Sequence, residues 1–396
     1  MLKASFNPNI PNLLYRLDYR VYSRPFRIPL HTHHGAWTER QGILIRLSTK
    51  QGHISFGEIA PLPWFGSESL EEALDLCKKL GPFAKRTDLL SLPENYPASQ
   101  FGFESAIESL QTAIAQQESI AIQASSQLLN QSQNTKPDNS THDSIKTLPS
   151  VPPCCQLLPT GKAALTAWQI SWNKGSQSFK WKIGVDSVQS ELTLFRQLFA
   201  SLPPAATIRL DANGGLSMET ARQWLDLCDQ LNNQSHSQGH PQYASTPLTD
   251  FRFSKVPTIE FLEQPLPPDR FEDLLYLSRH YQTPLALDES VATFTQLEDC
   301  YKKGWRSVFV VKAAIAGSPS RLRQFCRQHK LDVVWSSVLE TAIARQFIIN
   351  HLIPTVPSSA RSLGFGVEQW FKSSSLDQTE PEYIWNSCGE SCQLER

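Results

Sequence analysis

Ionisable residues follow a series of short apolar stretches in the second half of the chain, each where a stretch ends. They are Lys180 and Lys182 in FKWKIG, Asp211 after TIRL, Glu263 after TIEFL, Asp288 after LAL, and Lys312 after VFVV. From Asp211 to Lys312 the successive spacings are 52, 25 and 24 residues. A strand, a crossover helix and two loops need roughly that length, and the longer step has room for an insertion as well.

Strand ends of this kind converge if the strands form a (β/α) barrel, because the carboxyl ends of its strands open on one face. Asp211, Glu263 and Asp288 would then form an oxygen-rich pocket without histidine or cysteine. Such a donor set favours a hard divalent cation, Mg2+ above all, with water or substrate completing the octahedron. Without a cation the three carboxylates would repel one another and their pKa values would rise.

The lysines complete this chemistry. Lys180 and Lys182 are two residues apart, so both point into the barrel, and Lys312 stands on the other side of the carboxylates in strand order. Removing a proton alpha to a carboxylate requires stabilisation of the enediolate, which a bound metal supplies. A neutral lysine can take that proton, and a cationic neighbour helps to lower its pKa.

Taken singly, each of these residues has an ordinary structural interpretation. Asp211 with Asn213 and Gly214 could form a turn, and Glu263 could be a loop acid. The two neighbouring lysines could lie on the solvent face of an edge strand. Five successive strands that each carry an ionisable group at the same end favour the chemical interpretation, since an interior lysine pair is costly unless it is used.

The elements that must position these residues alternate regularly. Seven short strands are predicted at 154–159, 179–184, 207–212, 258–263, 284–289, 307–312 and 332–337, with helical periodicity in the stretches between them. This alternation indicates parallel strands joined by right-handed crossovers. It fits a TIM-type barrel better than a doubly wound sheet, because no G-x-G-x-x-G follows any strand.

The chain before the barrel differs in pattern. Strands are predicted at 14–22, 42–47 and 54–59, with Gly52 in a turn, and helices after Ser67 or Ser69 and over 103–117. We therefore expect an α+β domain at 1–118, a polar insertion or linker at 119–150, the barrel at 151–371 and a tail at 372–396. Residues 232–256 are predicted to be a second insertion within the barrel, and both polar insertions to be solvated loops.

Composition excludes several classes of protein. The net charge of −1 gives no electrostatic case for a nucleic acid or a membrane surface as partner. No apolar run is long enough for a transmembrane helix, and the first residues show no signal-peptide core. Eight cysteines in 396 residues are too few for a disulfide scaffold and form no zinc-binding spacing, which favours a cytoplasmic protein with reduced thiols.

The segments FKWKIG, RLDANGG, EFLEQP, LALDES and FVVKAAIAGS resemble the muconate-lactonising subgroup of the enolase superfamily. GEIAPLPWFGSESLEEA resembles its capping domain. Within the subgroup the sequence is most similar to the o-succinylbenzoate synthases, through CCQLLPTG, WSSVLETAIA and SLGFG. The resemblance implies a modified (β/α)7β barrel with an N-terminal capping domain.

It also implies roles for individual residues. Lys182 would be the general acid and base, Lys180 its electrostatic partner, and Lys312 the cation opposite. Asp211, Glu263 and Asp288 would bind Mg2+, with Asn213 and Glu289 supporting them. The succinyl end of a small carboxylate substrate would contact Ser336, Ser337 and Gly364. Loops near His31–Arg40 and Leu62–Phe65 would close over the opening of the barrel.

The implied reaction is a carbon–oxygen lyase step, the syn dehydration of 2-succinyl-6-hydroxy-2,4-cyclohexadiene-1-carboxylate in menaquinone and phylloquinone biosynthesis. An N-acylamino acid racemase or a muconate cycloisomerase would use the same lysines, and a non-catalytic barrel is a further alternative. Dipeptide epimerases are disfavoured because SLGFG stands in place of their D-x-D motif. Ala313 follows Lys312 where many relatives carry proline, and the oligomeric state is open.

Overall fold

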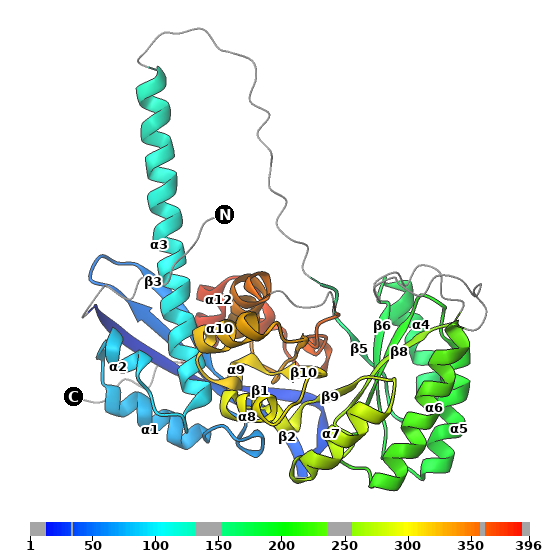
Figure 1. Cartoon of the computed structure of the whole chain (residues 1–396). Coiled ribbons are helices and arrows are strands. Elements are labelled where there is room, and N and C mark those ends of the chain that lie inside the picture. The colour runs from blue at the N-terminus through cyan, green and yellow to red at the C-terminus, as the bar shows by residue number, and fades with distance from the viewer. Residues whose placement is uncertain (1–12, 33–34, 132–151, 237–255, 357–360, 390–396) are drawn as a thin grey trace.

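The structure, a computed structural model, describes residues 13–32, 35–131, 152–236, 256–356 and 361–389. It has an antiparallel sheet of four strands near the N-terminus and a curled sheet of seven parallel strands beyond it (Figure 1). The described helices include none that is both long and apolar enough to cross a membrane.

The N-terminal sheet has the order β3-β2-β1-β4. Its strands are β1 (Leu14–Thr32), β2 (Gly35–Ser48), β3 (Ile54–Ile59) and β4 (Phe83–Lys85), and its helices are α1 (Leu70–Leu80), α2 (Arg86–Leu90) and α3 (Pro97–Gln131). Helix α3 lies on β3, where a Cβ atom on Gly57 would stand 2.1 Å from the carbonyl oxygen of Gly102. Only glycine permits the helix and the strand to approach so closely. Ser69 caps α1 in a capping box with Glu72, as one of the two predicted caps.

The parallel sheet runs β5 to β11 in sequence order. Its strands are β5 (Gln156–Leu157), β6 (Ser178–Lys182), β7 (Thr207–Asp211), β8 (Thr258–Glu263), β9 (Leu285–Leu287), β10 (Val308–Val311) and β11 (Val333–Trp335). The helices that follow them are α4 (Ala164–Asn173), α5 (Val188–Ser201), α6 (Met218–His236), α7 (Phe271–His280), α8 (Phe294–Lys302), α9 (Ala313–Ala316), α10 (Pro319–His329) and α11 (Ala342–Phe347). All seven predicted strands are present.

A short eighth segment joins the two edges of this sheet. Leu363 forms a parallel bridge with Cys154 before β5, and Gly364 forms one with Ser336 after β11. The nitrogen of Gly364 donates to the carbonyl of Trp335 at 2.8 Å, and the nitrogen of Leu363 donates to that of Pro153 at 2.8 Å. The predicted fold class, a modified barrel with a capping domain, is confirmed.

Strand β6 shows how the barrel sorts side chains. Phe179 and Trp181 are fully buried, and Trp181 stacks on Phe195 of α5 at 5.9 Å. The alternate residues Lys180 and Lys182 consequently point to the opposite face, into the barrel. The apolar packing of the strand against its helices thus fixes the direction of both lysines.

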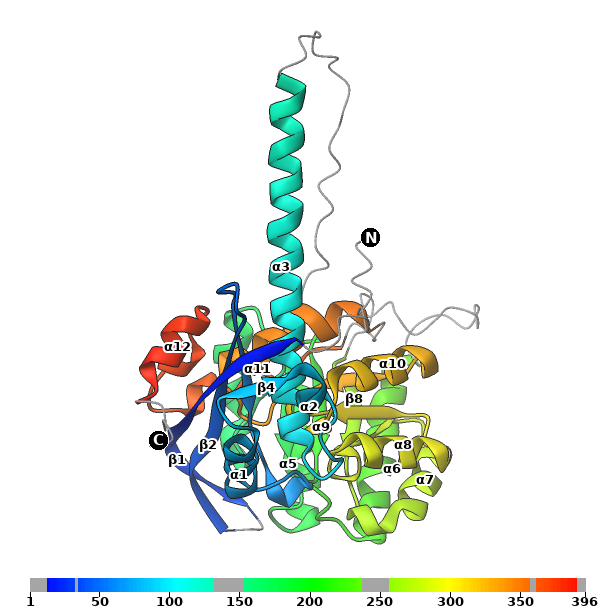
Figure 2. The ribbon, with the colours of Figure 1, turned by 90° about the vertical axis from the view of Figure 1, so that its left-hand side faces the viewer.

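Three expectations about segments outside the barrel strands are corrected. Helix α3 continues through residue 131, so 119–131 is helical rather than loop, and Figures 1 and 2 show this helix extending beyond the body of the molecule. Its alanine, glutamine, isoleucine and leucine residues sustain a helix, and no glycine or proline interrupts them. Helix α6 likewise runs to His236. The other residues of these insertions, 132–150 and 237–255, lie outside the described residues.

The third correction concerns the region 31–40, which was expected to be a loop. Residues 35–40 belong to strand β2, which pairs with β1 beyond a register shift between Pro25 and Leu30. The strand pattern was hidden because Pro25 and Pro29 interrupt the alternation of the partner strand.

Most of the C-terminal tail packs on the N-terminal sheet. Its helix α12 (Pro381–Ser387) places Trp385, only 1% exposed, in a cluster with Tyr22 and Leu44. Arg24 of β1 pairs with Asp377 of the tail, and Arg345 of α11 binds the same carboxylate at 3.1 Å. The tail therefore joins the capping domain to the barrel.

Candidate active site

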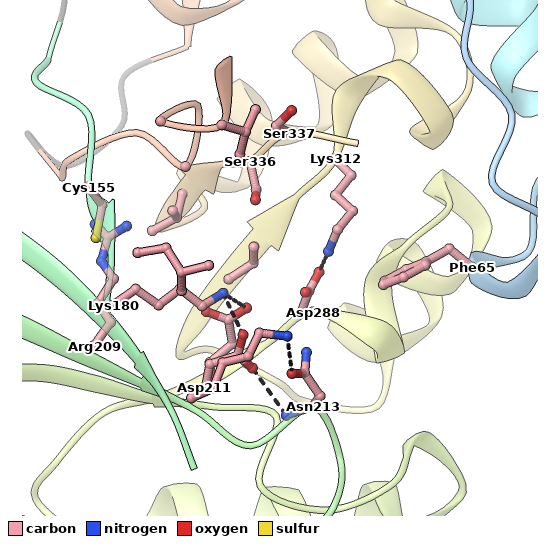
Figure 3. A pocket seen from close by; sticks show the side chains of 18 residues that line it. Phe65, Cys155, Lys180, Arg209, Asp211, Asn213, Asp288, Lys312, Ser336 and Ser337 are labelled. Carbon is pink, nitrogen blue, oxygen red and sulfur yellow. Dashed lines mark hydrogen bonds and ion pairs between the residues drawn. The ribbon is translucent and has the colours of Figure 1, made fainter. Parts of the chain in front are cut away.

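The register of three neighbouring strands brings the first site residues together. Lys182 of β6 lies opposite Asp211 of β7, and Asp211 lies opposite Glu263 of β8. Asp288 and Lys312 directly follow β9 and β10 in the same sheet. The carboxyl ends of five successive strands thus present ionisable side chains to one opening, as the spacing predicted (Figure 3).

Ten of the eleven predicted site residues line one pocket. They are Lys180, Lys182, Asp211, Asn213, Glu263, Asp288, Lys312, Ser336, Ser337 and Gly364. The eleventh, Glu289, reaches the site indirectly, since its Oε1 accepts a hydrogen bond from Asn213 Nδ2 at 3.1 Å. The structure therefore gathers all of these residues, from seven separate segments of the chain.

Lys180 is shared between two carboxylates. Its Nζ lies 2.8 Å from Asp211 Oδ2 and 2.7 Å from Glu263 Oε1. Burial acts to lower the pKa of Lys180, but attraction to Asp211, Glu263 and Asp288 outweighs it and raises that pKa well above its usual value. Lys180 is therefore a permanent cation in this arrangement, suited to hold charge rather than to exchange a proton.

The two carboxylates respond differently to the same lysine. Burial and repulsion by Asp211 raise the pKa of Glu263 to about 8, although Lys180 opposes the shift. Burial also acts to raise the pKa of Asp211, but attraction to Lys180 and Lys182 brings it below its ordinary value. One cation cannot fully neutralise two buried carboxylates, so the pKa of Glu263 rises while that of Asp211 falls.

Lys182 has a different environment from Lys180. Its Nζ donates to Asn213 Oδ1 at 2.9 Å. Asn213 has a φ of 45°, and its backbone nitrogen donates to Asp211 Oδ1 at 3.1 Å, which is the turn considered as the ordinary interpretation of this segment. The turn is part of the site, because it orients the amide oxygen of Asn213 toward Lys182.

Lys312 faces the site from β10. It forms an ion pair with Asp288 and is 7% exposed. Its Nζ lies 4.4 Å from the ring centre of Phe65, which comes from a short 3-10 turn of the N-terminal domain (Pro63–Phe65). The capping domain therefore contributes a side chain to the pocket, as expected for 62–65.

Asp211, Glu263 and Asp288 have the donor chemistry of a Mg2+ site. All three are at most 4% exposed, and the raised pKa of Glu263 reports excess negative charge that a cation would relieve. As the side chains stand, the described residues include no three acidic, histidine or cysteine groups converging closely enough to hold an ion. Instead, the ammonium groups of Lys180 and Lys312 form ion pairs with the carboxylates of Glu263 and Asp288.

Sequence reasoning did not identify Arg209 and Cys155 as pocket residues. Both line the pocket, together with Leu157, Val310, Val334, Gly366 and Val367. Arg209 precedes Asp211 by two residues and so points to the same face of β7. That alternation was the available signal for Arg209, whereas the position of Cys155 depends on how the barrel closes.

Comparison with known families supports this geometry. Residues 16–110 match the family model described as MenC, N-terminal domain, and residues 252–373 match the one described as Enolase C-terminal domain-like. The o-succinylbenzoate synthase of Thermosynechococcus vestitus is 35% identical over 373 residues, covering 93% of this chain and 98% of that protein. The o-succinylbenzoate synthase of Aliivibrio salmonicida is 26% identical over 310 residues, which cover 77% of this chain and 76% of that protein.

Solved structures agree. The crystal structure of o-succinylbenzoate synthase from Thermosynechococcus elongatus BP-1, complexed with Mg in the active site, matches with a TM-score of 0.73 at 35% identity, covering 94% of this chain and 99% of that one. A dipeptide epimerase from Enterococcus faecalis matches with a TM-score of 0.67 at 16% identity, covering 91% and 92%, and shows a shared fold alone. The resemblance drawn from the motifs is confirmed, and the chain belongs to the o-succinylbenzoate synthase family of the enolase superfamily.

Proposed function

We propose that this chain is a Mg2+-dependent o-succinylbenzoate synthase, a lyase that removes water from 2-succinyl-6-hydroxy-2,4-cyclohexadiene-1-carboxylate. The observation that carries the proposal is the pocket in which Lys182 and Lys312 flank, in strand order, the carboxylates of Asp211, Glu263 and Asp288. The family to which the chain belongs supports the choice of reaction.

Lys182 is the proton carrier in this proposal. Its Nζ has a neutral amide oxygen as its hydrogen-bond partner, so it can turn toward a substrate without breaking an ion pair. It takes the proton alpha to the substrate carboxylate and returns it to the departing hydroxyl, which leaves as water. The C–H electron pair stays in the ring and forms the new double bond, while the C–O electron pair leaves with the hydroxyl oxygen, and the ring becomes aromatic. Lys180 stays charged and holds the carboxylates of Asp211 and Glu263 beside Lys182.

Lys312 and the acidic residues carry the remaining charge. Asp211, Glu263 and Asp288 would hold Mg2+, and Asn213 and Glu289 would orient this set. The metal supplies Lewis-acid stabilisation of the negative charge that develops on the substrate carboxylate. Lys312 stabilises the same charge from the opposite side of the pocket.

Ser336, Ser337 and Gly364 form the wall proposed to receive the succinyl group. A Cβ atom on Gly364 would stand 2.8 Å from Ser336 Oγ, so glycine is needed for the segment to lie against this wall. The proposal keeps the division into a capping domain at 1–118 and a catalytic barrel at 151–371. It also places the reaction in the cytoplasm, in menaquinone or phylloquinone biosynthesis.

The test is to incubate the purified chain with the cyclohexadiene substrate and Mg2+ and to monitor the loss of diene absorbance. We expect turnover that stops with a chelator and resumes when Mg2+ is added. Absence of turnover by folded protein with Mg2+ present contradicts the proposal.

A racemase is distinguished in a second measurement. Incubation of an N-succinyl amino acid in deuterated water tests whether the alpha proton exchanges. A dedicated synthase leaves that proton in place while it turns over the cyclohexadiene. Exchange without dehydration would assign the pocket to racemisation instead.

A further inference from the structure

Arg40 of strand β2 is a buried guanidinium that binds two separate loops beside the pocket. It is 2% exposed, and the four hydrogen bonds recorded for it all run to backbone carbonyls. Nη2 donates to Ala60 at 2.6 Å and Nη1 to Pro61 at 2.8 Å, while Nε donates to Val338 at 2.9 Å. One side chain therefore bridges residues nearly three hundred positions apart.

The two loops that it joins form neighbouring parts of the pocket wall. The first, residues 60–65, is here termed the capping loop and ends at Phe65, whose ring lies over Lys312. The second, residues 336–341, is termed the β11 loop and begins with Ser336 and Ser337. Figure 3 shows Phe65 and Ser337 on either side of Lys312. A shift of one loop relative to the other would change the shape of the pocket.

The β11 loop holds a backbone conformation that needs external support. Leu339 has a φ of 66°, in the left-handed region that side chains other than glycine rarely adopt. Such strain, on the order of 1 kcal/mol, persists only where surrounding contacts determine the conformation. Arg40 binds the residue before Leu339, and Arg24 of β1 donates to the carbonyl of Glu340 after it at 3.2 Å.

Further contacts fix the same loop. Glu340 Oε2 accepts hydrogen bonds from Ser337 Oγ and from the nitrogen of Val338, both at 2.7 Å. Glu58 of β3, fully buried, accepts from Thr341 Oγ1 at 2.5 Å and so binds the end of the loop. The capping sheet thus holds the β11 loop at Val338, Glu340 and Thr341, and Arg40 differs from Arg24 and Glu58 because it also holds the capping loop.

We infer that Arg40 is a positioning residue that sets the distance between the capping loop and the β11 loop, and thereby the substrate-binding wall of the pocket. The inference rests on the proposed function for the identity of the substrate. The planar fork of arginine suits the role because it reaches several carbonyls in fixed directions. A lysine at this position keeps the charge but has a single nitrogen, so it cannot hold both loops in the same way.

The test compares Arg40→Met and Arg40→Lys with Arg46→Met. Arg46 lies on the same strand, is partly exposed and contacts Asp18 and Trp385 rather than either loop, so it is a matched control. We expect KM for the cyclohexadiene to rise at least tenfold in Arg40→Met and less in Arg40→Lys, and to stay within twofold in Arg46→Met. Mg2+ affinity should stay within twofold in all three, because the proposed ligands stand on barrel strands.

Hydrogen exchange followed by mass spectrometry gives a readout that does not depend on activity. Exchange should accelerate in Arg40→Met over residues 60–66 and 336–345 but not over β6, β7 and β8. An unchanged KM in Arg40→Met would overturn the inference. Faster exchange throughout the barrel, or loss of the fold in both Arg40 variants, would also overturn it by assigning Arg40 to general stability. An inactive wild type contradicts the proposed function instead, a separate outcome.

Discussion

Two glutamates on strand β8, three residues apart, have carboxyl groups whose pKa values move in opposite directions. Burial acts to raise the pKa of Glu260, but Arg209 and Arg361 outweigh it and bring that pKa below its ordinary value. Burial and repulsion by Asp211 raise the pKa of Glu263 to about 8. Both side chains are largely removed from water, so the difference comes from their charged neighbours.

Glu260 belongs to a cluster at the amino-terminal part of the strands, here termed the floor cluster. Arg209 Nε donates to Glu260 Oε2 at 2.7 Å, and Arg361 Nη1 donates to Glu260 Oε1 at 2.8 Å. Arg361 also makes a two-point contact with Asp332, at 2.9 and 2.8 Å. Two guanidinium groups thus meet two carboxylates in fixed geometry, which satisfies the charges.

The ionisable residues at and just beyond the carboxyl ends of strands β6 to β10, here termed the mouth cluster, are not balanced in this way. The cluster is composed of Lys180, Lys182, Lys312, Asp211, Glu263, Asp288 and Glu289, three lysines against four carboxylates. Burial and repulsion by Asp288 also raise the pKa of Glu289, to about 7. A cluster with surplus buried negative charge can accept a divalent cation, whereas a balanced cluster stabilises the fold.

The largest effect that separates the clusters is expected for Lys182→Ala. Removal of the proton carrier should lower kcat by about a thousandfold or more, since a positioned acid or base contributes roughly 10²–10⁴. Thermal unfolding should change little, because Lys182 makes one recorded hydrogen bond, to Asn213. The assay is diene loss, with Lys302→Ala on the exposed surface as the control. Undiminished turnover in Lys182→Ala would show that Lys182 is not the proton carrier.

The next effect is expected in the floor cluster. Glu260→Gln leaves Arg209, 2% exposed, without its carboxylate, and the lost pairing of a buried charge costs about 3 kcal/mol of unfolding free energy. Mg2+ affinity should not change, because Glu260 does not line the pocket. Urea unfolding at pH 7 measures the cost, with the partly exposed Glu298→Gln expected to lose under about 1 kcal/mol. Equal losses in both variants would mean that the floor cluster does not stabilise the fold.

The mouth cluster was more accessible to sequence reasoning than the floor cluster. Most mouth residues end or directly follow a strand, and strand ends are visible as the points where an apolar run stops, as at Asp211 and Lys312. Glu260 and Arg209 stand inside their strands instead, where a charged residue is ordinarily taken to face solvent. The register shift between Ile208 and Arg209 in the β7–β8 pairing is invisible in the sequence.

The fold could be predicted where local patterns determine it. The seven parallel strands and the helices between them follow from periodicity, and the order of the strands follows from their connections. Segments fixed by distant contacts could not be predicted. Strand β2 extends to Gly35 because β1 pairs with it, and α12 packs on the capping sheet through Trp385, which the sequence alone does not indicate.

The smallest effect is expected on the metal-free protein, in Glu263→Gln. The pKa of about 8 lies above the ordinary 4.5, so the folded state keeps a proton that the unfolded state releases between these values. Stability should therefore fall as pH rises from about 5 to about 8. Glutamine does not titrate, and its amide oxygen can still accept from Lys180, so the variant should lose less stability over this range.

Urea unfolding at pH 5 and pH 8 without Mg2+ measures this difference, with Glu298→Gln as the control. We expect Glu263→Gln to be more stable than wild type at pH 8, by on the order of 1 kcal/mol, and close to it at pH 5. Glu260→Gln should instead be less stable than wild type at pH 8, because the native carboxyl of Glu260 has a lowered pKa. The stabilisation by that carboxylate is present above its ordinary pKa and is lost in acid. If both variants were destabilised alike at pH 8, Glu263 would be a paired structural acid like Glu260, and the surplus charge that supports a metal at the mouth would not exist.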